Sequence, residues 1–376
     1  MSASLSAQTE EKKRIRHSQG VHRSLPASSA PLSFADNDYL GLSQHPMVTK
    51  AAIRAIQSSG TGARAARHLA GPCPEHSALE KKLAAWKKTE AALVFSSGYQ
   101  TPLGVIPSLV SPKDTILLER NAHACLFDGA RLSQARLRLF TRNDPSSLEE
   151  SLASARKLVP EGKILLVAES LHSMDGDFSD LAALTTLKER FGAWLLLDEA
   201  HANGVVGPEG GGWAAEKGLS HLVDIHMGTL GKALGSSGGF VAASASVIDH
   251  FVNEARTFLF GTAPSPVAMA AASEALHIIR SPEGGQLRTR LAHHIRFFNS
   301  RRPGSRPGPI QPVILQSNES VLRARDFLKS RGLETAAIRP PTVPEGTARL
   351  RLSLSSRHSK EDLKRLADEL DRLRSA

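Results

Sequence analysis

The chain has 376 residues, of which 41% are hydrophobic and 22% charged, so it can bury a large core and its composition argues against global disorder. Its two cysteines, Cys73 and Cys125, exclude a disulfide framework and favour a reducing cytoplasm. The formal net charge of +10 would suit nucleic acid, an anionic substrate or an acidic partner protein, but the basic residues are scattered, which favours a solvated surface.

The N-terminal segment is polar. "MSASLSAQTEEKKRIRHSQG" carries charge with no apolar run behind it, unlike a secretory signal, and no apolar stretch in the chain reaches the about 18 residues that span a bilayer. We therefore expect a soluble protein. Because "LPASSAPLS" should break regular structure, residues 1–45 are predicted to form an arm that lies on the main body.

Residues 46–280 alternate between helices and short apolar strands. A helix is predicted over 75–88, where Leu79, Leu83 and Trp86 keep helical spacing. Strands are predicted over 91–95, 114–119, 163–170, 193–200 and 224–228. These continuous apolar runs are typical of strands that are buried on both faces of a mostly parallel sheet. The pattern predicts a large α/β domain that binds its ligand beyond the carboxyl ends of the strands.

The pattern changes after about residue 280. "SPEGG" and "RRPGSRPGP" interrupt the regular elements. After them we predict the strand "PVILQS", the helix "SVLRARDFLKSRG", the strand "ARLRLSLS" and a final helix that follows the capping residue Ser359. Residues 281–376 are therefore predicted to form a small α+β domain.

The tetrad Asp198-Glu199-Ala200-His201, which follows a predicted strand, also names a class of nucleic-acid helicases. Such a nucleotidase needs the phosphate loop G-x-x-x-x-G-K-[ST] upstream of its acidic strand end. The upstream pair Gly162-Lys163 lacks both the first glycine and the final hydroxyl residue, and Gly231-Lys232 comes after the tetrad. The helicase interpretation is therefore disfavoured.

Polar residues follow each predicted strand of the large domain, and in a parallel sheet they should meet in one crevice. Among them, Lys232 comes 34 residues after Asp198, in the glycine-rich loop "GTLGKALGSSGG". A lysine there is either a phosphate-binding charge or a Schiff-base nucleophile, although a lone lysine is more often a surface charge and a lone aspartate a helix cap. Their joint placement favours a pyridoxal phosphate enzyme, which needs a lysine, an acid and a glycine-rich phosphate turn.

A set of motifs between Asn37 and His358 resembles the α-oxoamine synthases. These are fold-type I pyridoxal phosphate enzymes that condense an amino acid with an acyl thioester and release carbon dioxide. The motifs are "NDYLGL", "HSALE", "SSGYQ", "HACL", "SMDGD", "DEAHANGVVG", "TLGKALGSSGG" and "IRPPTVPEGTARLRLSLSSRH". The resemblance implies a large domain with a mostly parallel sheet and a small C-terminal α+β domain.

The resemblance also implies residue roles at the cofactor. Lys232 is expected to bond the cofactor and to remove the substrate α-proton, and Asp198 to pair with the pyridine nitrogen. His123 is expected to stack on the ring, whereas on its own it would more simply be a core histidine. The further implied contacts are Gly98, Tyr99 and Thr229 at the phosphate, Ser173 and His201 at the phenolic oxygen, and Thr262 at the phosphate of the partner subunit in a homodimer.

The implied substrate contacts come from both ends of the chain. Asn37 and Arg351 resemble the residues that grip the amino acid carboxylate, and Arg349 is the competing choice for Arg351. Thr342 matches a substrate-contact position. An arginine near the N-terminus, Arg14 or Arg16, is expected at the acyl end.

The segment "RPPTVP" favours family members that condense L-alanine with a pimeloyl thioester, carried by coenzyme A or by an acyl carrier protein, over relatives that use glycine. No metal ion and no nucleic acid or membrane partner is implied. The chain departs from the usual family pattern at Pro72-Cys73-Pro74, Cys125, His172, Gly211 and Gly261. A sister enzyme with another amino acid, or a basic nucleic-acid-binding protein, stays open as an alternative.

Overall fold

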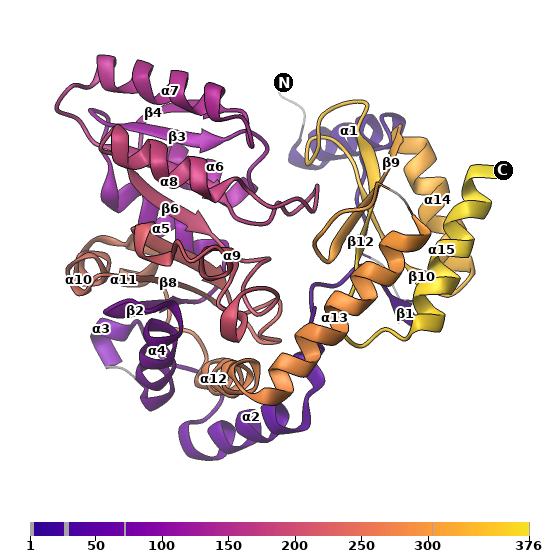
Figure 1. The fold of residues 1–376 in the computed structure, drawn as a ribbon, viewed down its shortest axis with the longest axis horizontal. Helices are drawn as coiled ribbons and strands as arrows, with labels where there is room; N and C mark the ends of the chain where they lie inside the picture. Colours follow the sequence, from indigo (N-terminus) through magenta and orange to yellow (C-terminus); the bar gives the residue numbers. More distant parts are fainter. Residues whose placement is uncertain (1–3, 26–29, 71–72, 303, 376) are drawn as a thin grey trace. The chain divides into compact units, whose positions relative to one another are not determined.

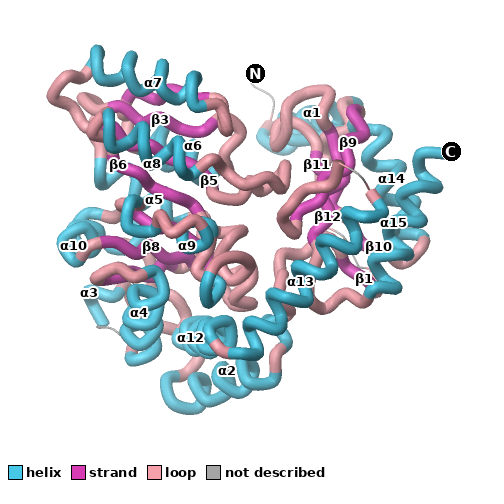
Figure 2. Tube along the Cα trace, in the orientation of Figure 1, coloured by secondary structure: helices cyan, strands magenta, loops and turns pink. Residues whose placement is uncertain are grey.

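A computed structural model describes residues 4–25, 30–70, 73–302 and 304–375. The chain divides into two compact units (Figures 1 and 2). The large unit comprises Asn37–Ser173 and Asp177–Ala292, and the small unit comprises Met1–Asp36, Met174–Gly176 and His293–Ala376. The domain boundaries expected at residues 45 and 280 stay a prediction.

A seven-stranded sheet lies at the centre of the large unit (Figure 1). Its strand order is β2-β8-β7-β6-β5-β3-β4. Strand β8 is antiparallel to both neighbours, and the other adjacent strands are parallel. The strands are β2 Ala91–Phe95, β3 Thr115–Glu119, β4 Arg136–Phe140, β5 Ile164–Glu169, β6 Trp194–Asp198, β7 Ile225–Thr229 and β8 Gly239–Ala243.

Helices cover both faces of this sheet. One face packs against α5 Gln100–Leu109, α6 Ala124–Leu132 and α10 Ala245–Glu254, and the other against α7 Pro145–Leu158 and α8 Leu181–Arg190. Strand β5 shows the alternation, because Leu165 and Val167 join the first cluster whereas Ile164 and Leu166 join the second. Burial on both faces explains the continuous apolar runs of the sequence.

The remaining helices complete the two units. They are α1 Leu5–Ser18, α2 Pro46–Ser59, α3 Arg67–Ala70, α4 Pro74–Lys87, α9 Trp213–Glu216, α11 Arg256–Leu259, α12 Pro266–Arg280, α13 Pro282–Arg301, α14 Asn318–Ser330 and α15 Lys360–Ser375. Short 3-10 helices occur at Leu42–Gln44, Pro208–Gly210 and Ser220–Leu222. Across the described ranges, no helix combines the length and the apolar character that a bilayer crossing requires.

The five strands predicted for the large domain are present, as β2, β3, β5, β6 and β7. Strands β4 and β8 were not predicted. Strand β4 lies at the edge of the sheet, where a strand has one neighbour and is partly exposed, so "RLRLF" alternates between polar and apolar residues. Strand β8 follows the glycine-rich loop directly, and its small residues "GFVAA" gave no strong strand signal.

The small unit contains a three-stranded antiparallel sheet in the order β11-β12-β9 and a parallel pair, β1-β10. Its strands are β1 Leu32–Ser33, β9 Ile310–Gln316, β10 Leu333–Glu334, β11 Ala336–Ile338 and β12 Ala348–Ser353. The strands and helices predicted from "PVILQS" onward are confirmed as β9, α14, β12 and α15.

The N-terminal segment is more regular than expected. Helix α1 begins after Ser4, whose hydroxyl accepts a hydrogen bond from the Ala7 amide. The helix buries none of its side chains, so it has no apolar stripe that a sequence pattern could reveal. The expectation that "LPASSAPLS" breaks every regular element is wrong at Leu32–Ser33, which form β1. Residues 26–29 of that stretch lie outside the described residues.

Glu199 anchors a buried ion-pair network beside the end of β6. Lys87 Nζ lies 2.7 Å from Glu199 Oε2 and also donates to Asn203 Oδ1 and, at 2.8 Å, to the Gly211 carbonyl oxygen. His226 Nδ1 lies 3.3 Å from Glu199 Oε2. Burial alone would raise the pKa of Glu199, but Lys87 and His226 lower it to about 2. The network holds the loop 207–212 against the sheet.

The substitution Lys87→Met should lower the free energy of unfolding by about 3–5 kcal/mol, because it leaves the Glu199 carboxylate buried without its ammonium partner. Denaturant unfolding of the cofactor-free protein measures this. The matched control is Lys82→Met on the same helix, whose ammonium bonds the Ser273 hydroxyl at the surface and which should change stability by less than about 0.5 kcal/mol. Equal unfolding midpoints for the two variants would contradict the expected role of Lys87.

Candidate active site

The loops at the carboxyl ends of the strands enclose a cavity of about 180 Å³ in the large unit. The predicted site residues that line it are Gly98, Tyr99, His123, Asp198, Thr229 and Lys232. They follow or end β2, β3, β6 and β7, so the structure brings these loops together as a parallel sheet predicts. Cys125 and Glu169 also line the cavity and were not among the predicted contacts.

Asp198 is the last residue of β6. Residues two apart on a strand share a face, so Asp198 lies on the same side as Leu196, which is covered by α5 and α6. Its carboxylate is buried, and Oδ1 accepts a hydrogen bond of 2.9 Å from the Ala200 amide. Burial raises the pKa of Asp198, and the Lys232 charge and the Ala200 amide oppose this shift.

Lys232 and His201 are in direct contact. Lys232 Nζ lies 2.7 Å from His201 Nε2, and His201 Nδ1 lies 2.7 Å from the Tyr39 hydroxyl. The Tyr39 hydroxyl donates in turn to Asn37 Oδ1 at 3.1 Å. These bonds connect Asn37 with Lys232 through two buried rings. Tyr39 was not predicted as a site residue, although it belongs to the motif "NDYLGL".

His123 precedes helix α6 and caps it. Its Nδ1 accepts a hydrogen bond of 3.3 Å from the Cys125 amide and lies 2.9 Å from Cys125 Sγ. Burial, together with the charge of Lys232, lowers the pKa of His123, which favours the neutral ring. The Tyr99 ring stands nearly perpendicular to it, with the centroids 6.2 Å apart.

Gly98 allows the loop after β2 to approach the end of β7. A Cβ atom at this position would lie 3.0 Å from Thr229 Oγ1, so a side chain would displace the threonine hydroxyl. That hydroxyl donates to the Gly238 carbonyl oxygen and accepts from the Gly231 amide, at 3.1 and 3.2 Å. Helix α5 begins at Gln100, directly after Gly98 and Tyr99, so its N-terminal amides lie next to this loop.

Glu169 ends β5 in register with Asp198 on the neighbouring strand. It is 3% exposed, and its Oε2 has no hydrogen-bond partner among the described residues. Burial, and next the charge of Asp198, raise the pKa of Glu169 to about 8. The sequence could have indicated this residue, because Glu169 ends the apolar run "KILLVAE" as Asp198 ends the run "WLLLD".

Three expected cofactor residues do not line the cavity: His201, which contacts Lys232, and also Ser173 and Thr262. Ser173 is buried and is the last residue of the large unit before Met174. The Thr262 carbonyl oxygen accepts a hydrogen bond of 2.8 Å from Ser96 Oγ, close in sequence to Gly98. The expected contact of Thr262 with a partner subunit stays a prediction.

The expected substrate residues of the small unit have partners there. Arg14 lies 3.5 Å from Glu11 on helix α1, and Thr342 Oγ1 accepts from Arg23 at 3.1 Å. On β12, Arg351 donates to Ser353 Oγ at 3.0 Å and Arg349 forms a 2.5 Å ion pair with Asp175. The roles of Arg14, Thr342 and Arg351 stay predictions.

One departure from the family pattern creates a buried ionic cluster. His172 Nε2 lies 2.5 Å from Glu119 Oε1, and Nδ1 lies 2.9 Å from the Asp177 carbonyl oxygen. Burial alone would lower the pKa of His172, but hydrogen bonds to Asp177 and Glu119 raise it to about 10. His172 is therefore a buried cation that joins the ends of β3 and β5.

Two further departures, Gly261 and Cys73, have structural explanations. Gly261 approaches the backbone closely, because a Cβ atom there would lie 2.4 Å from the Thr257 carbonyl oxygen. Cys73 caps helix α4, and its amide donates to His76 Nδ1 at 3.3 Å. Pro72 lies outside the described residues.

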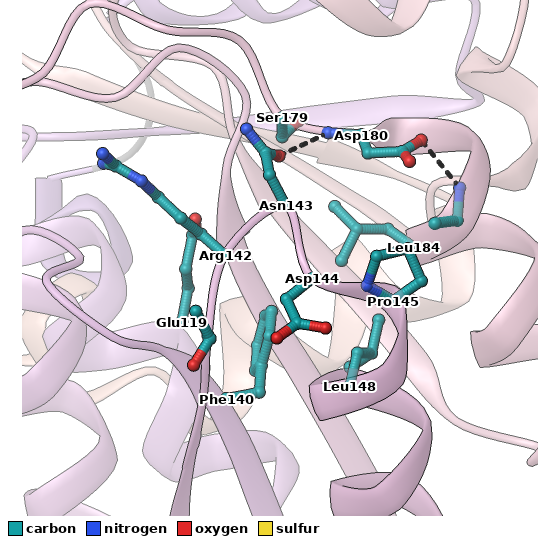
Figure 3. A pocket seen from close by; sticks show the side chains of 12 residues that line it. Glu119, Phe140, Arg142, Asn143, Asp144, Pro145, Leu148, Ser179, Asp180 and Leu184 are labelled. Carbon is teal, nitrogen blue, oxygen red and sulfur yellow. Dashed lines mark hydrogen bonds between the residues drawn. The ribbon is translucent and has the colours of Figure 1, made fainter.

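A second cavity lies near the ends of β3 and β4, among side chains of the α7 and α8 face (Figure 3). The Asp180 amide donates to Asn143 Oδ1 at 2.8 Å, and Asp180 Oδ1 caps helix α8 at the Ala183 amide (Figure 3). The volume of about 20 Å³ suits about one water molecule, so this cavity is too small for a substrate.

The residues around the larger cavity fit pyridoxal phosphate. The buried Asp198 carboxylate requires a cationic partner, and a protonated pyridine nitrogen is one. Lys232 supplies an amine, and the loop at Gly98 next to the N-terminus of α5 suits a phosphate group. Among the residues that the structure describes, no group of three or more His, Cys, Asp or Glu side chains could hold a metal ion.

The substitution Glu169→Gln should stabilise the cofactor-free protein increasingly as the pH rises. The pKa of Glu169 is raised on folding, so its protonated carboxyl contributes to the free energy of unfolding. This contribution is fully present below about pH 4 and is lost as the pH rises through about 8. Glutamine cannot ionise, so the Tm difference from wild type should grow between about pH 5 and pH 8. Thermal unfolding measures it, with Glu150→Gln, an exposed carboxyl on α7, as the control. A Tm difference that is constant with pH would refute the assignment.

Known proteins resemble this chain over almost its whole length. Residues 30–370 match the aminotransferase class I and II family. The 8-amino-7-oxononanoate synthase of Geobacter sulfurreducens is 42% identical over 344 residues, which are 90% of this chain and 87% of that protein. The same enzyme of Aromatoleum aromaticum is 41% identical over 370 residues, which are 94% of each chain.

Solved structures agree with this assignment. A serine palmitoyltransferase of S. paucimobilis with a bound PLP–myriocin aldimine has a TM-score of 0.91 and 25% identity, over 99% of this chain and 98% of that one. An 8-amino-7-oxononanoate synthase of Francisella tularensis has a TM-score of 0.77 and 26% identity, over 91% and 97%. The fold class and the cofactor expected from the sequence are confirmed. The chain therefore belongs to the aminotransferase class I and II family, as one of its pyridoxal phosphate-dependent α-oxoamine synthases.

Proposed function

We propose that this protein is an 8-amino-7-oxononanoate synthase, which condenses L-alanine with a pimeloyl thioester and releases carbon dioxide and the free thiol in biotin biosynthesis. The observation that carries the proposal is that Lys232 and Asp198 line one cavity in a chain 41–43% identical to enzymes of that name. A homodimer, with Thr262 reaching the partner's cofactor phosphate, is part of the proposal.

The proposed cofactor contacts follow from the groups around the cavity. When bound, pyridoxal phosphate supplies an electron sink that stabilises negative charge on the substrate α-carbon. Asp198 holds the proton on the pyridine nitrogen, and His123 packs on the ring. The contacts proposed for the rest of the cofactor are Gly98, Tyr99 and Thr229 for the phosphate, and His201 and Ser173 for the phenolic oxygen.

Lys232 carries the proton transfers in this proposal. Its amine would hold the cofactor aldehyde, and after alanine has taken its place Nζ would be the base for the substrate α-proton. The contact of 2.7 Å with His201 supports this role, because it holds Nζ at the cavity in a defined orientation.

The substrate would be oriented by its carboxylate. We propose Asn37 and Arg351 for this carboxylate, Thr342 as a further contact and Arg14 at the acyl end. Arg349, which forms an ion pair with Asp175, is the competing choice for Arg351, which donates to Ser353 Oγ. The net charge of +10 suits either anionic acyl carrier, coenzyme A or an acyl carrier protein.

The second candidate is a sister enzyme that uses serine or glycine. It is favoured by the TM-score of 0.91 with a serine palmitoyltransferase, against 0.77 with an 8-amino-7-oxononanoate synthase. Backbone similarity describes the scaffold, whereas specificity depends on the side chains of the site. The higher identity with the 8-amino-7-oxononanoate synthases, 42% against 25%, therefore supports alanine.

A product assay tests the choice of substrate. The purified protein, loaded with pyridoxal phosphate, should convert L-alanine and pimeloyl-coenzyme A or pimeloyl-acyl carrier protein into 8-amino-7-oxononanoate and carbon dioxide. Its kcat/KM with alanine should exceed that with glycine or L-serine by about tenfold or more, since a single methyl or hydroxyl difference in a pocket gives discrimination of this order. A higher kcat/KM with serine or glycine would decide for the second candidate.

The substitution Lys232→Ala should leave the fold intact and lower kcat on the order of a thousandfold or more, because it removes both the covalent bond to the cofactor and the base. In wild type, borohydride should attach the cofactor to the peptide that contains Lys232, as mass spectrometry detects. Lys81→Ala, an exposed lysine on α4, is the control and should retain both properties. Turnover by Lys232→Ala, or attachment at another lysine, would refute the role of Lys232.

A further inference from the structure

Tyr39 lies behind His201 in the interior of the large unit, outside the cofactor and substrate contacts named above. It is 1% exposed, and its hydroxyl is 2.7 Å from His201 Nδ1 and 3.1 Å from Asn37 Oδ1. The opposite ring nitrogen, His201 Nε2, is 2.7 Å from Lys232 Nζ. Both nitrogens of the imidazole are therefore engaged, one by the tyrosine and the other by the lysine.

The protons of these four groups determine the tautomer of His201. Asn37 Oδ1 is an acceptor only, so the single hydroxyl proton of Tyr39 is donated to it. His201 Nδ1 must then carry a proton, which it donates to the Tyr39 oxygen. A neutral imidazole has one proton, so Nε2 is left with a lone pair that faces Lys232 Nζ.

A lone pair at this place matters for the capture of the cofactor. A protonated lysine is not a nucleophile and must lose a proton before it can bond an aldehyde carbon. We infer that Tyr39 is a positioning residue, which holds His201 in the Nδ1-protonated tautomer so that Nε2 can accept a proton from Lys232 during cofactor capture. The inference rests on the proposed role of Lys232 as the residue that bonds the cofactor.

The proton balance of this step is complete. The Lys232 ammonium gives one proton to His201 Nε2, which makes the ring an imidazolium. The amine lone pair then forms the bond to the aldehyde carbon, and the two remaining protons of Nζ leave with the aldehyde oxygen as water. His201 later returns its proton to solvent or to the lysine when substrate displaces it. No oxidant or further reactant is needed.

The other titratable groups that face Lys232 are poorer proton acceptors. Glu169 and Cys125 hold their own protons at neutral pH, because burial raises the pKa of each. Asp198 attracts the ammonium, which makes a separate acceptor more necessary. His123 uses Nδ1 to cap helix α6. His201 is the titratable group whose ring nitrogen contacts Nζ at hydrogen-bond distance.

The test is the rate at which the cofactor-free protein captures pyridoxal phosphate, followed by visible absorbance from about pH 6 to about pH 9.5. In Tyr39→Phe the ring is kept but Nδ1–H loses its acceptor, so the tautomer with a proton on Nε2 is favoured. Capture by Tyr39→Phe should be slower than wild type by about tenfold or more at pH 7, and should approach the wild-type rate at the alkaline end, where solvent removes the lysine proton.

Thr185→Val is the matched control, because it deletes a buried hydroxyl that bonds the Leu181 carbonyl oxygen within helix α8. Its capture profile should coincide with that of wild type. An unchanged profile for Tyr39→Phe, or a rate lowered by the same factor at every pH, would overturn the inference, since a merely structural role predicts no change in the pH dependence.

Two further measurements keep the test decisive. His201→Gln removes the proton acceptor itself, so its rate of cofactor capture should be slow at pH 7 and should rise toward the wild-type rate at alkaline pH. This test holds even if Tyr39→Phe does not fold. Rapid capture by His201→Gln at pH 7 would also overturn the inference. Borohydride treatment of each captured sample identifies the attached lysine. Attachment away from Lys232 would refute the proposed function of that lysine, whereas attachment at Lys232 with unchanged profiles would refute the inference alone.

Discussion

At the end of β6, two adjacent carboxylates are buried on opposite sides of the sheet. The site depends on this arrangement. Strand geometry sends Asp198 to the face covered by α5 and α6, and Glu199 toward the other face. Each buried charge requires a partner, because an unpaired carboxylate in the interior costs several kcal/mol. Glu199 contacts Lys87 and His226 within the protein, whereas for Asp198 we propose the protonated pyridine nitrogen of the cofactor as the cation.

Glu199 belongs to a structural ion-pair network, whereas Asp198 lines the cavity. The Lys87–Glu199 network joins helix α4, the end of β6 and the loop 207–212. On the other face, Asp198, Glu169 and Lys232 line the cavity, and burial raises the pKa of both carboxyl groups. Carboxyl groups whose pKa values are shifted by burial and neighbouring charge cluster at functional sites.

The sequence predicted the residues at the strand ends but missed those that support them. Gly98, His123, Asp198, Thr229 and Lys232 were found because each follows an apolar strand in a parallel pattern. Tyr39 and Glu169 were missed for different reasons. Tyr39 reaches His201 from 162 positions earlier in the chain, and no local spacing encodes such a contact. Glu169 is an ordinary polar strand end in the sequence, and only the register between β5 and β6 shows that it lies beside Asp198.

The sequence by itself determined the class of fold, the order of the five apolar strands, the family and the cofactor, because continuous apolar runs and short motifs are local signals. Only the tertiary structure decided which of two neighbouring acids faces the cavity, that Lys87 is buried as a counter-ion, and that Tyr39 orients the histidine beside Lys232. These outcomes depend on strand register and on long-range hydrogen bonds, which form between segments that the sequence keeps far apart.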